Sequence, residues 1–178
     1  MPARMDEYLD KVIENRFSVS LMSNSKWRKV FTVLDVPELM LKQCYWKFVD
    51  NDDEFLGWFT KSDELMEKYV GDYGSGPFAY KRIEWLEIPK VGKPSGYENV
   101  PFKHWHQDID GALSILNSIG QFDTELTGRG LRIYGFREYT YNKAFKSDSA
   151  TRASFASLTV WHALRHALTR RYDFLRSR

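Results

Sequence analysis

The segment FDTELTGRGLRIYGF, residues 122–136, decides the fold, because two short runs of alternating apolar and polar residues flank a glycine-rich turn. The turn is Gly128-Arg129-Gly130, and glycine adopts the positive φ angles that a three-residue hairpin loop requires. The pattern predicts two antiparallel strands, at residues 122–127 and 131–136. A sheet that is at least partly antiparallel follows from it.

Three segments upstream of this hairpin also predict strands. Residues 41–49 (LKQCYWKFV) and 78–88 (FAYKRIEWLEI) are rich in aromatic and branched side chains, which strands favour. Alternation in the second segment predicts that Ile83 and Trp85 share one face. Residues 55–59 follow a polar run and are expected to form a short partner strand.

Helical spacing of apolar residues predicts helices at residues 4–16 and 109–119, and another that begins near Ser23 and ends before Pro37. A further short helix is expected just before Gly71, because a capping-box spacing precedes it. Strands joined by hairpins as well as by helices indicate an α+β fold. We expect a mostly antiparallel sheet of about four to six strands with helices packed on it.

The length of 178 residues fits a single domain over residues 1–178, with an N-terminal helical segment at 1–22 and a long C-terminal helix at 152–178. Residues 152–178 contain six arginines and one aspartate, a net charge of +5 that leaves −3 for residues 1–151. Apolar residues recur there at helical spacing, namely Phe155, Leu158, Trp161, Leu168, Tyr172 and Leu175. The C-terminal helix is therefore expected to be basic and amphipathic.

Two roles are open for this C-terminal helix. Its apolar face favours docking on its own domain or on a second copy, which would make the protein a homodimer. Its arginines favour contact with nucleic acid, since each arginine placed against a phosphate releases counterions. Docking is the preferred role because of the apolar face, and nucleic acid is not the expected partner.

Composition also points to the cytoplasm. Cys44 is the only cysteine, so no disulfide can form within the chain. Charged residues interrupt residues 1–16, and no apolar run approaches the ~20 residues of a membrane span. We expect a cytoplasmic protein without a membrane segment.

The sequence contains no complete catalytic motif. No Gly-x-Ser-x-Gly occurs, and Gly74-Ser75-Gly76 lacks the lysine and the strand-to-helix setting of a phosphate-binding loop. Glu84 with Glu87 would be an acid–base pair only if the fold brought the two carboxyl groups to a substrate. We therefore expect a protein that is not an enzyme and that has no cofactor.

The alternative is a metal site at His104-Trp105-His106-Gln107-Asp108, because histidines at alternate positions of an extended segment can converge on one ion. The segment resembles the His-x-His-x-Asp-His motif of metallo-β-lactamase-like hydrolases, with Ile109 in place of the last histidine. A metal-dependent hydrolase using His104, His106 and Asp108 is thus the alternative function. His162 and His166 form a second pair at helical spacing, and we expect no metal at either pair.

A partner-binding surface is predicted at the acidic run Asp50-Asn51-Asp52-Asp53-Glu54, which follows a strand and is too polar for the core. Carboxylates can mimic the phosphates that a nuclease groove binds, and aromatic side chains anchor protein interfaces. The predicted partner-binding residues are Asp50, Asp52, Asp53, Glu54, Phe55, Trp58 and Trp105.

Three segments carry a resemblance to a family of small bacterial proteins without assigned function: residues 25–31 (SKWRKVF), 83–88 (IEWLEI) and 120–136. The resemblance covers about residues 24–138 and implies no catalytic residue. In its size the chain is also similar to the cytoplasmic immunity proteins that bacteria pair with toxin domains, including those of contact-dependent growth inhibition and other polymorphic toxin systems. That similarity implies a non-catalytic protein that neutralises a cognate toxin domain by direct binding.

Overall fold

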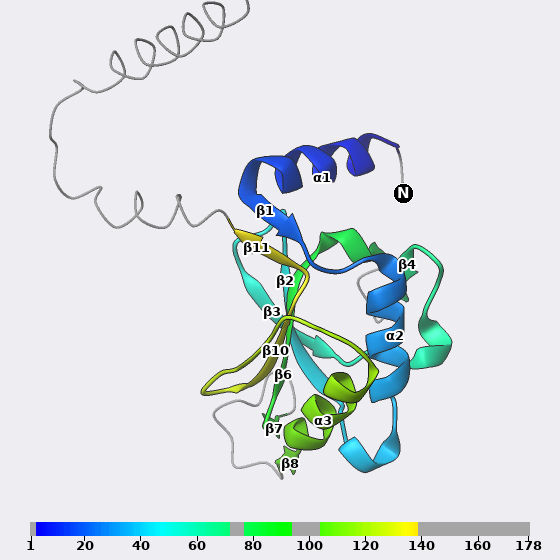
Figure 1. Cartoon of the computed structure of the whole chain (residues 1–178), viewed down its shortest axis with the longest axis vertical. Helices are drawn as coiled ribbons and strands as arrows, with labels where there is room; N and C mark the ends of the chain where they lie inside the picture. Colours follow the sequence, from blue (N-terminus) through cyan, green and yellow to red (C-terminus); the bar gives the residue numbers. More distant parts are fainter. Residues whose placement is uncertain (1–2, 72–76, 94–103, 139–178) are drawn as a thin grey trace, which may run out of the picture. The chain divides into compact units, whose positions relative to one another are not determined.

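Five antiparallel strands form the main sheet of the protein (Figure 1). The computed structural model describes residues 3–71, 77–93 and 104–138. The strand order is β3-β2-β6-β10-β9. The strands are β2 (Gln43–Phe48), β3 (Glu54–Trp58), β6 (Ile83–Pro89), β9 (Thr124–Leu126) and β10 (Gly130–Tyr134). The predicted hairpin at residues 122–136 is confirmed as the pair β9–β10.

Two helices, α2 (Asn24–Leu34) and α3 (Ile109–Ile119), lie side by side and cover one face of this sheet (Figure 1). Each begins with a side-chain cap. Ser23 Oγ accepts a hydrogen bond from the backbone N–H of Lys26 (3.2 Å), and Asp108 Oδ1 accepts one from that of Gly111 (2.9 Å). The α+β fold with helices packed on an antiparallel sheet is confirmed.

The main core lies between these helices and the sheet. Phe31 of α2 is fully buried and contacts three other aromatic rings, with centroid distances of 5.8 Å to Trp27, 5.9 Å to Trp46 and 5.6 Å to Phe59. Alternate residues of the central strands point toward the helices, namely Cys44, Trp46, Phe48, Leu86, Ile88, Leu131 and Ile133. Their burial is the principal driving force for the fold.

The remaining side chains of the same strands define a second face, here called the polar face. It carries charged and aromatic residues: Tyr45, Lys47, Glu84, Trp85, Glu87, Arg132 and Tyr134. A register shift between β2 and β6 at Lys47 and Phe48 accounts for one wrong prediction. It places Ile83 in the core but Trp85 on the polar face, because a bulge inserts a residue into the alternation.

A two-stranded ribbon and the first helix form a separate small cluster. Helix α1 (Ala3–Arg16) leads directly into β1 (Phe17–Ser20), which pairs antiparallel with β11 (Phe136–Glu138). The helical segment expected over residues 1–22 therefore ends at Arg16, and β1 was not predicted. The buried residues of the cluster are Leu9, Phe17, Val49 and Phe136.

The remaining elements are short. They are the 3₁₀ helices η1 (Pro37–Leu39), η2 (Ser62–Glu64) and η3 (Tyr80–Arg82) and the strand pairs β4 (Tyr69–Val70) with β5 (Phe78–Ala79) and β7 (Val91–Gly92) with β8 (Trp105–His106). The short helix predicted before Gly71 is wrong. Only one 3₁₀ turn forms there, and Tyr69 and Val70 instead hydrogen-bond to β5 as a strand, so tertiary pairing overrides the local pattern.

Several predictions fall outside the described residues. The C-terminal helix at 152–178, His162 and His166, and the glycine-rich segment at 74–76 belong to this group. Within the described ranges, no helix is long and apolar enough to cross a membrane.

Candidate partner-binding site

The acidic run predicted as a binding surface forms the hairpin turn between β2 and β3, and its four carboxylates have different surroundings. Asp50 points inward: its side chain is 9% exposed, and both carboxylate oxygens accept hydrogen bonds from Arg82 Nε at 2.9 and 3.1 Å. The same guanidinium lies 4.5 Å from the centroid of the Phe48 ring. Asp50 thus holds the base of the turn and is not free to meet a partner.

Asp52 and Asp53 lie at the tip of the turn and face solvent. The Asp52 side chain is 92% exposed, with its Oδ1 3.8 Å from both Arg16 Nη2 and Lys47 Nζ. Ion pairs this long and this exposed contribute little stability, so both cations can exchange Asp52 for another partner. The Asp53 backbone N–H donates to Asn51 Oδ1 (2.9 Å), which fixes the turn while leaving the Asp53 carboxylate exposed. We call residues 51–53 the acidic tip.

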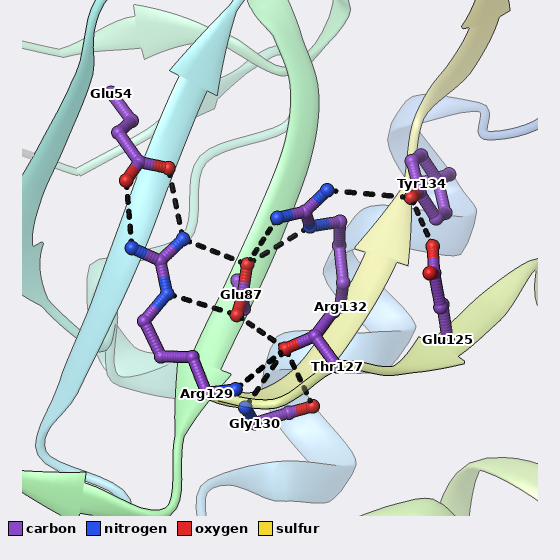
Figure 2. Close-up of polar contacts among 8 residues, drawn as sticks. All are labelled: Glu54, Glu87, Glu125, Thr127, Arg129, Gly130, Arg132 and Tyr134. Atoms are coloured by element: carbon purple, nitrogen blue, oxygen red, sulfur yellow. Dashed lines mark hydrogen bonds and ion pairs between the residues drawn. The ribbon is translucent and has the colours of Figure 1, made fainter.

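Glu54, the fourth carboxylate, is bound by an arginine from the β9–β10 hairpin (Figure 2). Arg129 Nη1 and Nη2 donate to the two Glu54 oxygens at 2.7 and 2.9 Å, the bidentate geometry in which this pair is strongest. These hydrogen bonds lower the pKa of Glu54. The contact ties the hairpin to the edge strand β3.

Glu87 is the centre of this network and is fully buried within the polar face (Figure 2). Its Oε1 accepts from Thr127 Oγ1 (2.7 Å) and Arg129 Nε (2.9 Å), and its Oε2 accepts from Arg129 Nη2 (2.9 Å) and from Arg132 Nε and Nη2 (2.9 and 2.6 Å). Burial alone would raise the pKa of Glu87. Hydrogen bonds from Arg129, Thr127 and Arg132 outweigh that penalty and lower the pKa to about 2.

The other carboxylate considered for acid–base chemistry, Glu84, lies elsewhere on the polar face. Its Oε2 is 3.4 Å from Arg16 Nη2 and 3.9 Å from Lys47 Nζ. Burial raises the pKa of Glu84, opposed by the charges of Lys47 and Arg16. Glu84 and Glu87 are thus held by different cations and share no hydrogen-bond partner.

Three arginines on or beside the polar face have their guanidinium groups over aromatic rings. Their Cζ atoms are 3.8 Å from the ring centroid of Tyr45 for Arg129, 4.1 Å from that of Trp85 for Arg132, and 3.6 Å from that of Tyr134 for Arg137. Arg137 also makes a bidentate ion pair with Asp123 at 2.7 and 2.8 Å. The positive charges of this face are thus neutralised inside the protein, which makes the face a poor phosphate-binding surface.

The two aromatic residues predicted beside the acidic run both lie on β3 and are exposed, Phe55 by 36% and Trp58 by 49%. Phe55 adjoins the acidic tip and contacts the Phe48 ring at a centroid distance of 5.1 Å. Trp58 lies at the other end of the strand, paired with Gln43. The structure therefore places the acidic tip and Phe55 together and separates Trp58 from them.

Trp105 lies on a different element, the β7–β8 ribbon. Its indole stands against Gly92, where a Cβ would overlap the ring, and Lys42 Nζ is 5.7 Å from the ring centroid. The Trp105 side chain is half-buried and its Nε1 has no hydrogen-bond partner among the described residues. Trp105 thus packs one ribbon onto the domain and is not part of the acidic surface.

The residue that sequence reasoning overlooked in the histidine segment is Gln107. His104 and His106 are exposed, and the Asp108 carboxylate caps α3, whereas Gln107 is 4% exposed. Gln107 Oε1 accepts from the backbone N–H groups of Lys42 and Gln43 at 2.6 and 2.8 Å. Its Nε2 donates to the carbonyls of Gln43 (3.0 Å) and Pro89 (2.7 Å).

Within residues 3–71, 77–93 and 104–138, no three His, Cys, Asp or Glu side chains come close enough to hold a metal ion. Cys44 is fully buried in β2, and burial raises the pKa of its thiol well above the usual range. The thiol therefore stays protonated near neutral pH and is a poor nucleophile.

Residues 9–140 match a protein-family model described as "Family of unknown function (DUF6678)". The match covers α2, α3 and all five strands of the main sheet, and also the acidic tip. No curated protein and no solved structure matches the chain.

Proposed function

Since the chain belongs to the DUF6678 family of unknown function, we propose its function from the surface alone: it binds another protein through the acidic tip, as an immunity protein that neutralises a bacterial toxin domain in the cytoplasm. The observation that carries the proposal is the contrast among four neighbouring carboxylates. Asp50 and Glu54 are held by arginines, whereas Asp52 and Asp53 face solvent on a well-anchored turn.

The anchoring of the turn supports a binding role. The tip is held at its base by the Asp50–Arg82 pair and on the β3 side by the Glu54–Arg129 pair. A rigid loop loses little conformational entropy when it binds, and exposed carboxylates on such a loop raise the rate of association with a basic groove. A toxin that acts on nucleic acid has a groove of that charge, since it must bind phosphates.

The acidic tip therefore predicts a charge-reversal phenotype. The variant Asp52→Lys/Asp53→Lys is expected to bind the toxin about 100-fold more weakly at low salt, because two attractive contacts become repulsive. The measurements are the affinity for the purified product of the neighbouring toxin gene, and the growth of cells that express the toxin together with either form of this protein.

The matched control is Glu38→Lys/Glu67→Lys, which makes the same change of charge at two exposed glutamates outside the turn. It is expected to bind and to protect cells as the unaltered protein does. Full protection and unchanged affinity in the Asp52→Lys/Asp53→Lys variant would remove the acidic tip as the site. Absence of any complex with the neighbouring gene product, and of any protection, would contradict the immunity function itself.

A further inference from the structure

Strand β3 leaves one edge of the main sheet open in the part of the chain that the structure describes, since only β2 pairs with it. Natural edge strands are usually protected by lysine, proline or a bulge. None of these occurs in β3, whose sequence is EFLGW. Its one charge, Glu54, is already neutralised by Arg129. Phe55 and Trp58 are exposed along the same strand.

The backbone groups of β3 alternate between the two sides of the strand. The N–H of Phe59 donates to the carbonyl of Lys42 (2.9 Å), so Phe59 faces β2. Alternation in an antiparallel pair then turns Gly57 and Phe55 toward β2 as well. The N–H and C=O groups of Glu54 and Leu56 and the N–H of Trp58 consequently point outward, in the geometry that accepts another strand. The Trp58 carbonyl, at the end of the strand, accepts a hydrogen bond from Cys44 Sγ (3.3 Å).

The sequence of β3 is self-complementary when a second copy runs antiparallel about a two-fold axis at Leu56. Leu56 then lies opposite Leu56 of the second copy, and Glu54 lies opposite Trp58, so no like charges meet. Phe55 lies opposite Gly57, which has no side chain to occupy the space in front of it. Residues 54, 56 and 58 are also the ones with outward-pointing backbone groups, so the register uses all of them.

Side-chain positions agree with this register. A Cβ on Gly57 would lie 2.9 Å from Trp46 Nε1, so any larger residue would displace Trp46. The ring of Phe55 from the second copy would cover this edge of Trp46. On the polar face, Trp58 of the second copy would lie beside the partly exposed Glu54–Arg129 pair, where its ring would cover the pair and contact the guanidinium.

We propose that two copies of this chain associate through β3, antiparallel and centred on Leu56, so that the two five-stranded sheets become one continuous sheet. Such an isologous pair occupies the β3 edge of both copies, and its two-fold symmetry closes this interface, so association through β3 stops at two chains. The proposal goes beyond the toxin-binding function, because it involves the purified protein alone. It also differs from a homodimer built by the C-terminal helix.

The test uses opposite charges at the two-fold axis. The full-length protein is expected to sediment at twice the mass of one chain. Leu56→Lys and Leu56→Glu should each raise the dissociation constant of the dimer about 100-fold, because each places like charges directly opposite one another. An equal mixture of the two variants should restore the dimer, now as a heterodimer, because the two charges become complementary.

Leu126→Lys serves as the control, since Leu126 is 55% exposed on β9 at the other edge of the sheet, and its dimer should be unchanged. Thermal melts of each variant establish that it is folded. A protein that remains monomeric at all concentrations, or a dimer that tolerates both Leu56 variants, overturns the proposal. Loss of the dimer in both variants without rescue in the mixture overturns the two-fold register at Leu56.

Discussion

Replacing Glu87 with alanine is expected to lower the free energy of unfolding by about 3 kcal/mol at neutral pH, as measured by denaturant titration. The carboxylate is fully buried and accepts five hydrogen bonds from Thr127, Arg129 and Arg132. Its removal leaves two guanidinium groups without their shared partner on a partly desolvated face. The value is at the low end for a broken buried pair because both arginines keep some contact with water.

The pH dependence of this loss identifies its cause. The pKa of Glu87 is about 2 in the folded protein and near 4.5 when unfolded, so the unfolded chain binds more protons between these values. The contribution of Glu87 is therefore fully present above pH 4.5 and is lost as the pH falls toward 2. Glu84 has the opposite effect on the pH dependence of stability, because burial raises its pKa and so favours its protonated form in the folded state.

Glu87→Gln separates the charge of Glu87 from its shape. Its stability deficit relative to the unaltered protein should shrink as the pH falls from 7 toward 2, because protonation removes the same charge from Glu87. Glu54→Gln is the matched control, since Glu54 binds the same Arg129 but is 41% exposed, and we expect it to cost less than 1 kcal/mol. A Glu87→Gln deficit that is constant across this pH range would show that charge is not the source of the stability.

Periodicity was sufficient to predict most of the main sheet and its helices. The glycine-rich turn Gly128-Arg129-Gly130 predicted the β9–β10 hairpin, and the spacing of apolar residues predicted α2 and α3. The helix caps and the strand alternation of these elements agree with the final structure. The reason given for the turn is wrong, because neither Gly128 nor Gly130 adopts the positive φ expected there. The expected role of helix 152–178 stays a prediction, because those residues lie outside the described ranges.

The elements that sequence reasoning did not find depend on register between distant strands. Strand β1 has only four residues, FSVS. It forms because it pairs with β11, which lies more than a hundred residues further along the chain. The Glu87 network likewise requires that Arg132 lie directly opposite Glu87 in the β6–β10 pair. The two glutamates inside the otherwise apolar strand β6 were the available signal, since a buried carboxylate needs a cationic partner.

The acidic surface was predicted in part. Asp50, Asp52, Asp53 and Glu54 were predicted to form one surface because they are close in the sequence. Closeness in the sequence does not show which of these carboxylates form ion pairs within the protein. Arg82 and Arg129 hold the first and last of them, and only the fold brings those arginines near. The distinction matters for function, because only Asp52 and Asp53 retain charge that a partner can use.

The Gln107→Ala variant is expected to lose about 4 kcal/mol of unfolding free energy, the largest single effect predicted for this protein. The Gln107 carboxamide satisfies four backbone groups: the N–H groups of Lys42 and Gln43 and the carbonyls of Gln43 and Pro89. These groups belong to the start of β2 and the end of β6, so one side chain joins two strands to the segment that leads into α3. Alanine leaves all four without a protein partner in a buried site, and each unsatisfied group costs about 1–3 kcal/mol unless water enters.

Gln107→Glu tests whether the amide hydrogen bonds, rather than the volume of the side chain, provide this stability. Glutamate has nearly the same shape, and one oxygen can still accept from Lys42 and Gln43, but its second oxygen would face the carbonyls of Gln43 and Pro89. We expect a loss at neutral pH as large as that of Gln107→Ala, with partial recovery on acidification as the protonated carboxyl becomes a donor. His106→Ala, at the exposed neighbouring position, should change the unfolding free energy by less than about 0.5 kcal/mol. If Gln107→Glu is as stable as the unaltered protein at neutral pH, the two Nε2 hydrogen bonds contribute nothing, and the cost of Gln107→Ala arises from the cavity alone.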